Sequence, residues 1–524
     1  GTPLQTAAER GLSRALKDFF AAHYVTERMC LCVLGRNPLA ELETMVHKHF
    51  GPLPPTPEAS RGQGCAAAGP AQPPGPEGAE GPPFSPSTLG RVVYYSPIKN
   101  LNQITIHWML PNTEGRNRYA RPHEFLEYLL GTQAEGSLND VLQTQGWLEG
   151  MACGVEASLR EWEVFQLSVD LTDKAEASRL KEDIIAFIFR YLDMVRHSPT
   201  EALRKIHGQL QTLSELDFRY SERGDSEWTA ESIATNMLHY PMEDVVAGDY
   251  MMEWDEGLLR EYLTYLDPAK SIITISAAAD FQQAVDCEVH EEPWYRTQYK
   301  TKDIIKCSDM LQKAARQEML SSQALEEASH TLHLPNPNPY LPTDFGLRAE
   351  AVRAYSLQHG GKPVLEAQNE REQLFKTPPH LLDGSPGHRL WYKMDGTYRM
   401  PRCAVFIRLA RPQPTDLPTL EWELQVYAFL EFLLEVMAEQ IQDAQTAGLG
   451  LEVGVNITDV SLDFFGMSQH LPAYMLRVLS TLRHLTDSLA DYYSLGTDHI
   501  ELRRPPLTDH EVSSLAKKFE AVCW

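Results

Sequence analysis

The sequence predicts an α+β protein of tandem homologous two-layer domains, each a sheet with helices packed against one side. Segments of alternating apolar residues, typical of strands with one buried face, occur as neighbours, for example at residues 104–110 and 163–171. Apolar residues at helical spacing follow, as at residues 184–195. The order of strands, helix, strands and helix recurs after residue 345, and this repetition predicts a duplicated domain.

The amino-terminal segment is predicted to contain a helix, a strand and a helix, followed by a linker. Residues 9–25 and 39–50 have helical spacing, and residues 29–34 (MCLCVL) are a candidate buried strand that ends at Gly35. Residues 53–90 are rich in Pro, Gly and Ala and have little apolar surface to bury, so they cannot offset the entropy of ordering the chain. We therefore expect a linker there.

The next unit is predicted to span residues 91–290. Its expected strands are residues 92–95, 104–110, 147–155, 163–171 and 271–277, and its expected helices are residues 125–131, 138–144, 184–195, 200–223 and 228–237. About 200 residues is a plausible size for one domain.

A connector and a further unit complete the chain. The connector covers residues 291–345, and its run LPNPNPYLPTDF has too many prolines for a helix or an inner strand. The last unit, residues 346–524, is expected to be an incomplete domain. Its predicted strands are residues 389–394, 403–410, 451–457 and 461–467, and residues 420–446 are predicted to form one long helix.

Composition excludes two classes of protein. The chain has 524 residues, 43% of them hydrophobic and 23% charged, which is typical of globular domains. The net charge of −25 disfavours nucleic-acid binding. No apolar run approaches the roughly 18 residues that span a bilayer.

Eight cysteines without a CxxC pair indicate reduced thiols. The first residues lack an initiator methionine and a signal-peptide pattern, so we expect a segment from within a longer protein.

One short motif resembles a zinc-peptidase helix. His123 and Glu127 in HEFLE are four residues apart, a spacing that places two side chains on one helix face. A hydrolytic zinc site on one helix needs two such ligands with a carboxylate between them. No two histidines anywhere in the sequence are four apart, so HExxH and HxxEH are both absent. The structural interpretation, an exposed cap and a solvated face at a helix start, is therefore favoured.

Five segments are distinctive in combination: FFAAHYVTERMCLCVLGR at residues 19–36, GSLNDVLQTQGW at 136–147, EPWYRTQYK at 292–300, the proline-rich connector at 334–345 and LWYKMDGTYRMPRCAVFIRLARP at 390–412. Together they resemble the insulysin (insulin-degrading enzyme) branch of the pitrilysin-type zinc metallopeptidases. The resemblance is collinear over nearly the whole chain, and it implies the pitrilysin/LuxS-type metallopeptidase-like architecture.

The resemblance also implies where a metal would bind. Family members have four homologous domains around a chamber, with the zinc site in the first. Residues 1–52 would be the end of that domain, residues 91–290 the second and residues 346–524 the third. In the second domain the zinc-ligand positions fall on Glu124 and Tyr128, and the general-base position falls on Glu127. The full-length enzyme is thus expected to bind zinc, and the residues of this chain are expected to bind none.

A substrate exosite is implied as well. In the family, a strand of the second domain accepts the amino-terminal residues of the substrate as an added strand. Carried over by position, the exosite residues are Tyr128, Gly131, Gln133, Met151, Cys153 and Val155. The family has glycine at the position of Cys153 and glutamine at that of Val155, so both the approach of a substrate backbone and a polar contact are altered here.

Two functions follow as hypotheses. The first is the substrate chamber and exosite of an insulysin-like zinc metalloendopeptidase, whose full-length form is an enzyme although this part by itself is not. The second is a catalytically inactive paralogue that binds peptides or serves as a structural subunit. We expect peptide substrates as partners and a cytoplasmic location, with mitochondria, peroxisomes and a homodimer left open.

Overall fold

The alternating apolar residues of two predicted strands form the centre of a seven-stranded sheet in the computed structural model. In β2 (Gln103–Pro111), Ile104, Ile106 and Trp108 are fully buried, whereas Thr105 and His107 between them are only partly covered. β4 (Trp162–Leu171) has the same alternation. One face of the sheet is therefore the core, and the other is polar.

The structure describes residues 11–26, 29–53, 84–85, 87–97, 102–112, 117–158, 161–172, 181–221, 224–284, 287–303, 323–346, 378–384, 387–393, 400–410, 419–456 and 458–495. The chain divides into two compact units, residues 1–336 and 337–524. Most of the predicted linker, residues 54–83 and 86, lies outside the described residues.

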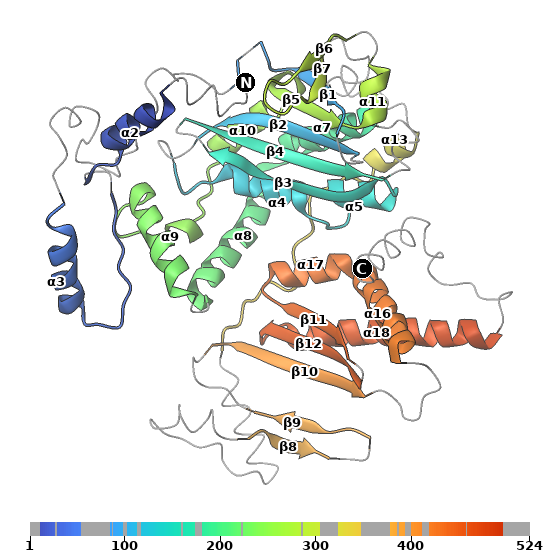
Figure 1. Cartoon of the computed structure of the whole chain (residues 1–524). Coiled ribbons are helices and arrows are strands. Elements are labelled where there is room, and N and C mark those ends of the chain that lie inside the picture. The colour runs from blue at the N-terminus through green and yellow to red at the C-terminus, as the bar shows by residue number, and fades with distance from the viewer. Residues whose placement is uncertain are drawn as a thin grey trace. The chain divides into compact units, whose positions relative to one another are not determined.

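The sheet of the first unit has the strand order β3-β4-β2-β5-β1-β7-β6 (Figure 1). The remaining strands are β1 (Arg91–Tyr95), β3 (Leu148–Ser158), β5 (Ser271–Ser276), β6 (Val289–Glu291) and β7 (Gln298–Asp303). β1 and β5 pair in parallel, and the other neighbours are antiparallel. Among the described strands, β3 and β6 are consequently the two edges of this sheet.

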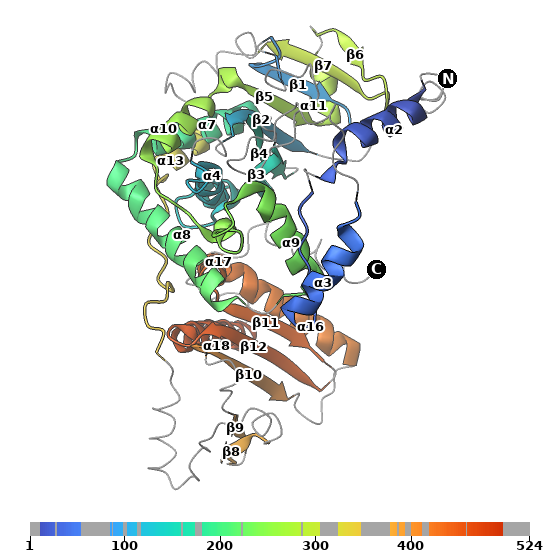
Figure 2. The ribbon, with the colours of Figure 1, turned by 90° about the vertical axis from the view of Figure 1, so that its left-hand side faces the viewer.

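Helices cover the apolar face of this sheet. Figure 2 shows α4, α7 and α10 on the same side of it. The helices of the unit are α2 (Leu12–His23), α3 (Leu39–Phe50), α4 (Pro122–Gly131), α5 (Leu138–Thr144), α7 (Lys181–His197), α8 (Thr200–Tyr220), α9 (Ser226–His239), α10 (Glu256–Tyr265), α11 (Ala278–Gln283) and α13 (Gln323–Ser329), with short 3₁₀ turns η3 (Gly248–Tyr250) and η4 (Pro268–Lys270). The predicted α+β layering is confirmed.

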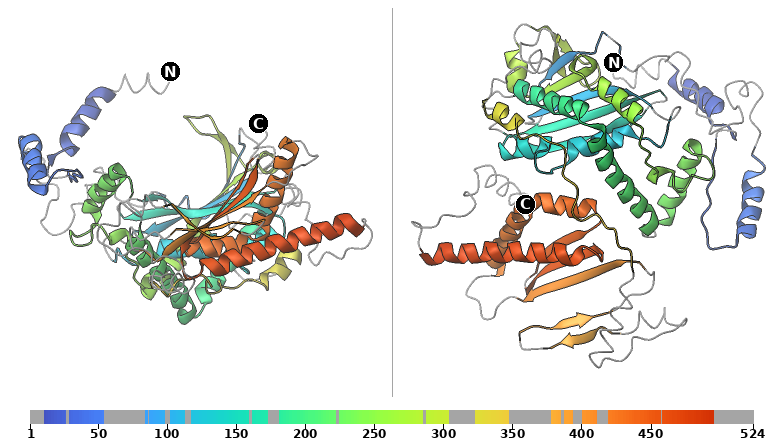
Figure 3. Two further views of the ribbon diagram at one scale, coloured as in Figure 1. Left: turned by 90° about the horizontal axis from the view of Figure 1, so that it is seen from below. Right: turned by 180° about the vertical axis from the view of Figure 1, so that it is seen from behind.

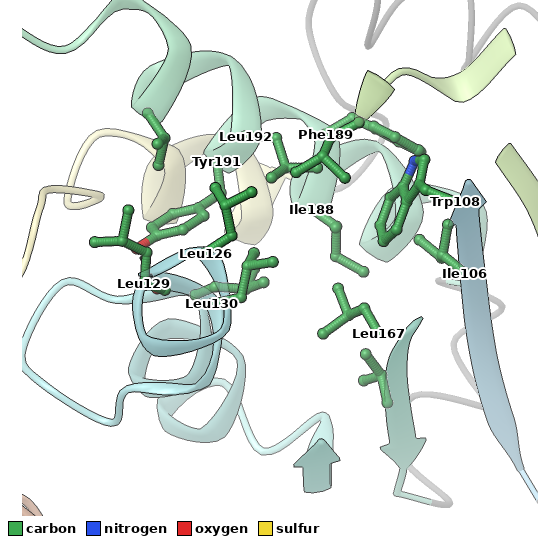
Figure 4. Close-up of a cluster of buried hydrophobic side chains, with 14 of the residues drawn as sticks. Ile106, Trp108, Leu126, Leu129, Leu130, Leu167, Ile188, Phe189, Tyr191 and Leu192 are labelled. Carbon is green, nitrogen blue, oxygen red and sulfur yellow. Dashed lines mark hydrogen bonds between the residues drawn. The ribbon is translucent and has the colours of Figure 1, made fainter. Parts of the chain in front are cut away.

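The core forms where α7 crosses the sheet and α4. Figure 4 shows side chains of α7 between those of the strands and those of α4. Trp108 meets Phe189 edge to face, with ring centroids 6.1 Å apart. The buried hydroxyl of Tyr191 donates to the carbonyl oxygen of Leu129 at 2.7 Å, so the one polar atom of this large side chain is satisfied. The amphipathic pattern at residues 184–195 thus fixes the position of α4.

The strand predicted at residues 29–34 is wrong. These residues form no strand, and Met29 and Leu34 are each 53% exposed. An extended apolar segment becomes a strand only when its backbone pairs with a neighbouring strand. None of the described strands pairs with residues 29–34.

The second unit repeats part of the first. Its three-stranded antiparallel sheet has the order β10-β12-β11, which corresponds to β2-β4-β3 in chain order and in space. Helix α18 packs on this sheet (Figure 3). The elements are β8 (His380–Asp383), β9 (Leu390–Tyr392), β10 (Arg402–Ala410), α16 (Thr419–Val436), α17 (Ala438–Thr446), β11 (Gly450–Val455), β12 (Asp459–Met467) and α18 (Leu471–Leu495). The same topology in both units supports the predicted duplication.

The long helix predicted at residues 420–446 is two helices instead. The chain leaves helical geometry at Met437, where φ is −106° and ψ is 13°. Both helices pack against β11, and Met437 itself is buried. No Gly or Pro marks this break, so tertiary packing sets it. The proline-rich residues 334–345 form neither helix nor strand, as predicted.

Candidate substrate-binding site

Helix α4 carries the zinc-peptidase-like motif along one side and the core along the other. Pro122 occupies its first turn, where a fixed φ and a missing N–H cost nothing. Phe125, Leu126, Leu129 and Leu130 are buried at helical spacing. The polar residues of the motif therefore lie on the opposite side, toward β3 and the ends of β2 and β4.

His123 is not the exposed cap that the sequence predicted. Its side chain is 19% exposed, and its Nδ1 lies 3.3 Å from Oε2 of the buried Glu163 on β4. Arg121 holds the helix start in a left-handed conformation (φ 40°) and donates to Glu124 Oε1 at 3.0 Å and to the carbonyl oxygen of Gly248 at 2.9 Å. These groups border a polar pocket of about 230 Å³. Their contacts join α4 to β4 and η3.

The residues at the inferred zinc-ligand positions do not fit a metal. The Glu124 carboxylate is paired with Arg121, and Tyr128 packs against the core. A zinc site takes three or four His, Cys, Asp or Glu ligands. Within the described ranges, no three such side chains gather as metal ligands. The absence of bound zinc in this chain stays a prediction.

Cys153 joins the carboxyl-terminal half of α4 to β3. Its Sγ donates to the carbonyl oxygen of Glu127 at 3.2 Å, and a Cβ at Gly131 would lie at an ordinary contact distance of 3.5 Å from the same sulfur. Burial, together with the Glu127 carboxylate, raises the pKa of the Cys153 thiol to about 12. A raised pKa disfavours the nucleophilic thiolate, and the contacts of Cys153 are a hydrogen bond to α4 and packing on the core.

Gly154 lets β3 pass close under Glu127. Its φ of +155° is rarely adopted by residues with a side chain, and a Cβ there would lie 3.3 Å from Glu127 Oε2. Partial burial and the nearby Glu124 raise the pKa of Glu127, while His123 lowers it. The carboxylate at the inferred general-base position thus lies directly over the backbone of the edge strand.

The six inferred exosite residues come from two neighbouring elements. Met151, Cys153 and Val155 of β3 are half-buried on the helix-covered side, while Ala152 between them is exposed. Tyr128 and Gly131 belong to α4, and Gln133 follows it. Tyr128 packs on the same core as the three strand residues. α4 and β3 are in contact.

Of the strands that the structure describes, only β4 pairs with β3. Its register with β4 runs from Leu148 opposite Leu171 to Ser158 opposite Glu163, with irregularities after Leu148 and after Val155. In an antiparallel ladder, alternate residues direct N–H and C=O away from the partner. Along the described sheet, these outward groups of β3 meet no further strand.

Some residues near the site were missed by reasoning from the sequence. Glu163 is buried beside His123, yet nothing in the strand pattern distinguishes it from an exposed polar residue. Gly154 did carry a signal, because a glycine inside a strand often marks a close approach of another group.

Two family models match the chain. Residues 13–206 match the peptidase M16 inactive domain, and residues 218–495 match the middle or third domain of peptidase M16. These matches show that the chain consists of peptidase-type domains, one of the inactive type and one of the middle type. The chain belongs to the peptidase M16 family, as the sequence resemblance predicted.

Two relatives illustrate the relationship. The nardilysin-like protein of Arabidopsis thaliana is 26% identical over 505 residues, which are 93% of this chain and 43% of the relative. The peroxisomal insulin-degrading enzyme-like 1 of Arabidopsis thaliana is 25% identical over 463 residues, 87% of this chain and 41% of the relative. The chain spans less than half the length of these curated relatives.

A solved structure gives the same fold. The crystal structure of pitrilysin superimposes with a TM-score of 0.61 over 97% of this chain and 46% of the pitrilysin chain, at 18% sequence identity. The pitrilysin-like α+β fold predicted from the sequence is confirmed.

Proposed function

We propose that this chain is the non-catalytic, substrate-binding part of an insulysin-like zinc metalloendopeptidase. Its role would be to hold an extended peptide as an additional strand on β3. The observation that carries this proposal is the outer edge of β3, next to α4, which pairs with no strand among the described residues. Cleavage would need a zinc site supplied by residues outside this chain, because Glu124 and Tyr128 do not form one.

The side chains of β3 suit such a role. Gly150, Ala152 and Gly154 are small, so a second backbone can approach the strand closely. Main-chain pairing tolerates many peptide sequences, as expected for an enzyme that degrades diverse peptides. Met151 and Val155 are only half-buried and can contact alternate side chains of the added strand.

An inactive peptide-binding or structural paralogue is the second candidate. Cys153 and Val155, where the family has glycine and glutamine, favour it, because the Cys153 sulfur fills space beside Gly131. An intact HxxEH motif in the rest of the protein would favour the peptidase, and its absence would favour the paralogue.

We further propose that the partners of the chain are peptide substrates and not nucleic acids. We propose a cytoplasmic location, with peroxisomes and mitochondria as alternatives. A homodimer is an alternative to the monomer. The peroxisomal label of one relative supports the alternative of peroxisomes. None of the helices in the described part of the chain is long and apolar enough to cross a membrane.

The test restores the residues of the family. The double variant Cys153→Gly/Val155→Gln should bind a fluorescently labelled, uncharged 12-residue peptide several-fold more tightly than the wild-type chain, as measured by fluorescence anisotropy. Val289→Gln on the opposite edge is the matched control and should leave this affinity unchanged. Equal affinity of the folded double variant and the wild type would place the peptide elsewhere.

A further inference from the structure

The hairpin of β6 and β7 presents two bare aromatic rings at its tip. Trp294 is 67% exposed and Tyr295 is 89% exposed, and Val289 on the adjoining edge strand is 51% exposed. Large aromatic side chains are seldom left in water, and Trp and Tyr are over-represented among the residues that dominate protein interfaces. This tip, residues 292–297, belongs to the EPWYRTQYK segment and takes no part in the proposed β3 site.

The tip is held rigidly. The Glu292 carboxylate accepts from the backbone N–H groups of Trp294 at 2.9 Å and of Tyr295 at 2.6 Å. Glu292 also exchanges backbone bonds with Thr297 and Arg296 at 2.9 and 3.0 Å. Arg296 has a left-handed φ of 61°, a strained conformation for a non-glycine residue. A turn fixed in this way presents the two rings with little ordering entropy left to lose on binding.

The neighbouring backbone is ready to pair. Glu292 N–H donates to the Thr297 carbonyl, so Glu292 and Thr297 form a hydrogen-bonded pair of the hairpin. Because such pairs alternate along an antiparallel ladder, the N–H and C=O groups of Val289 and Glu291 point away from β7. β6 has no strand on that side among the residues that the structure describes.

The acidic residues around the tip favour a basic partner. Residues 288–297 contain three glutamates and one arginine. Arg296 pairs with Glu291 at 2.7 Å, whereas the exposed Glu288 has no ion-pair partner in the described ranges. An exposed carboxylate at one end of β6 suits pairing with a Lys or Arg side chain, and the exposed aromatic rings at its other end suit a cation that lies over a ring.

We propose that the β6 edge and the Trp294–Tyr295 tip form a second docking site for an extended, basic polypeptide segment. The segment would pair with the outward backbone groups of Val289 and Glu291. It would pair one cationic side chain with Glu288 at the start of β6 and lay another over the Trp294 ring at the tip. This site lies at the edge of the sheet opposite to β3 (Figure 1).

The test is a titration of the chain with labelled 12-residue peptides at low salt, followed by fluorescence anisotropy. A peptide of alternating Arg and Val should bind. The double variant Trp294→Ala/Tyr295→Ala should weaken this binding by at least about tenfold. Trp228→Ala removes an equally bare tryptophan, 72% exposed on α9, and should have no effect. Equal binding of a Glu and Val peptide, absence of binding by the basic peptide, or equal affinities of wild type and double variant would overturn the proposal.

Three further measurements test strand pairing at this site and separate it from β3 and from misfolding. Hydrogen exchange at the Val289 and Glu291 amides should slow when the basic peptide binds, and unchanged exchange there would contradict strand pairing. The Trp294→Ala/Tyr295→Ala variant should bind the uncharged peptide of the β3 test as the wild type does. A loss of that affinity would mean that one site takes both peptides. Equal thermal unfolding midpoints of the aromatic double variant and the wild type would show that the variant is folded.

Discussion

Gly154 places a strict requirement on one backbone position of the edge strand. Gly154→Ala puts a Cβ at a φ of +155° and 3.3 Å from Glu127 Oε2. We expect the variant to lose about 1–3 kcal/mol of unfolding free energy, as strained positions do. Urea unfolding followed by tryptophan fluorescence measures this loss. Gly150→Ala on the same strand is the control, because its Cβ would meet Asp170 at an ordinary 3.6 Å. Equal stability of the two variants would refute the strain.

His207 makes the stability of the first unit depend on pH. It lies between Phe125 and Trp254, with ring centroids 5.6 and 5.2 Å away, and burial lowers its pKa below the ordinary 6.5. The unfolded chain therefore binds a proton near pH 6.5, whereas the folded chain binds it only at lower pH. This contribution to stability is complete above pH 6.5 and decreases as the pH falls below it, by at most about 1.4 kcal/mol per pH unit.

The variant His207→Phe keeps the ring and removes the titration. Between pH 7.5 and pH 5.5, the wild type should lose more unfolding free energy than this variant in otherwise identical urea titrations. Parallel losses in both proteins would show that His207 is not the titrating group.

Not every residue of the site could be predicted from the sequence. The exosite positions came from the family resemblance and stay a prediction, while the structure shows that a Cβ at Gly131 would lie 3.5 Å from the Cys153 sulfur. The burial of His123 against Glu163 could not be foreseen, because the two residues are 40 positions apart and only the fold makes them neighbours. The left-handed backbone at Arg296 could not be predicted either, because such a conformation is usually adopted by glycine and the sequence has arginine there.

Among the elements, α5 shows how one short motif begins a helix. Ser137 is fully buried, and its hydroxyl accepts from the Asp140 N–H at 3.2 Å, while the Asp140 carboxylate accepts from the Gly136 N–H at 2.9 Å. Ser137→Ala should cost about 1 kcal/mol, since it removes this cap. Ser226→Ala at the exposed start of α9 is the control and should cost much less. Chemical denaturation compares the two, and equal effects would mean that the cap contributes nothing.

Elements with strong periodicity were predicted well, and those that depend on distant partners were not. The strands at residues 104–110 and 163–171 needed only their own alternation, because each buries one face. The MCLCVL segment has the composition of a strand, yet pairing is a property of two segments. The break at Met437 follows from the packing of both helices on β11, and no residue near Met437 in the sequence predicts it.

At the scale of the whole molecule, we expect this chain to bind no stoichiometric zinc and to cleave no peptide by itself. No histidine pair has the ligand spacing, and Glu124 is held by Arg121. Elemental analysis of the purified chain after dialysis against zinc, together with a peptide-cleavage assay, measures both properties. One tightly held zinc ion per chain that is lost in a Glu124→Gln/Glu127→Gln variant would refute the expectation.

The central claim is that β3 receives substrate through its backbone, and hydrogen exchange tests it most directly. The chain is measured with and without a saturating uncharged peptide, and amide exchange is resolved along Leu148–Ser158. We predict slower exchange at alternate residues of β3, with no change at Val289 and Glu291 on the opposite edge, because pairing protects only the outward N–H groups. Unchanged exchange along β3 at a peptide concentration that saturates binding would contradict the claim.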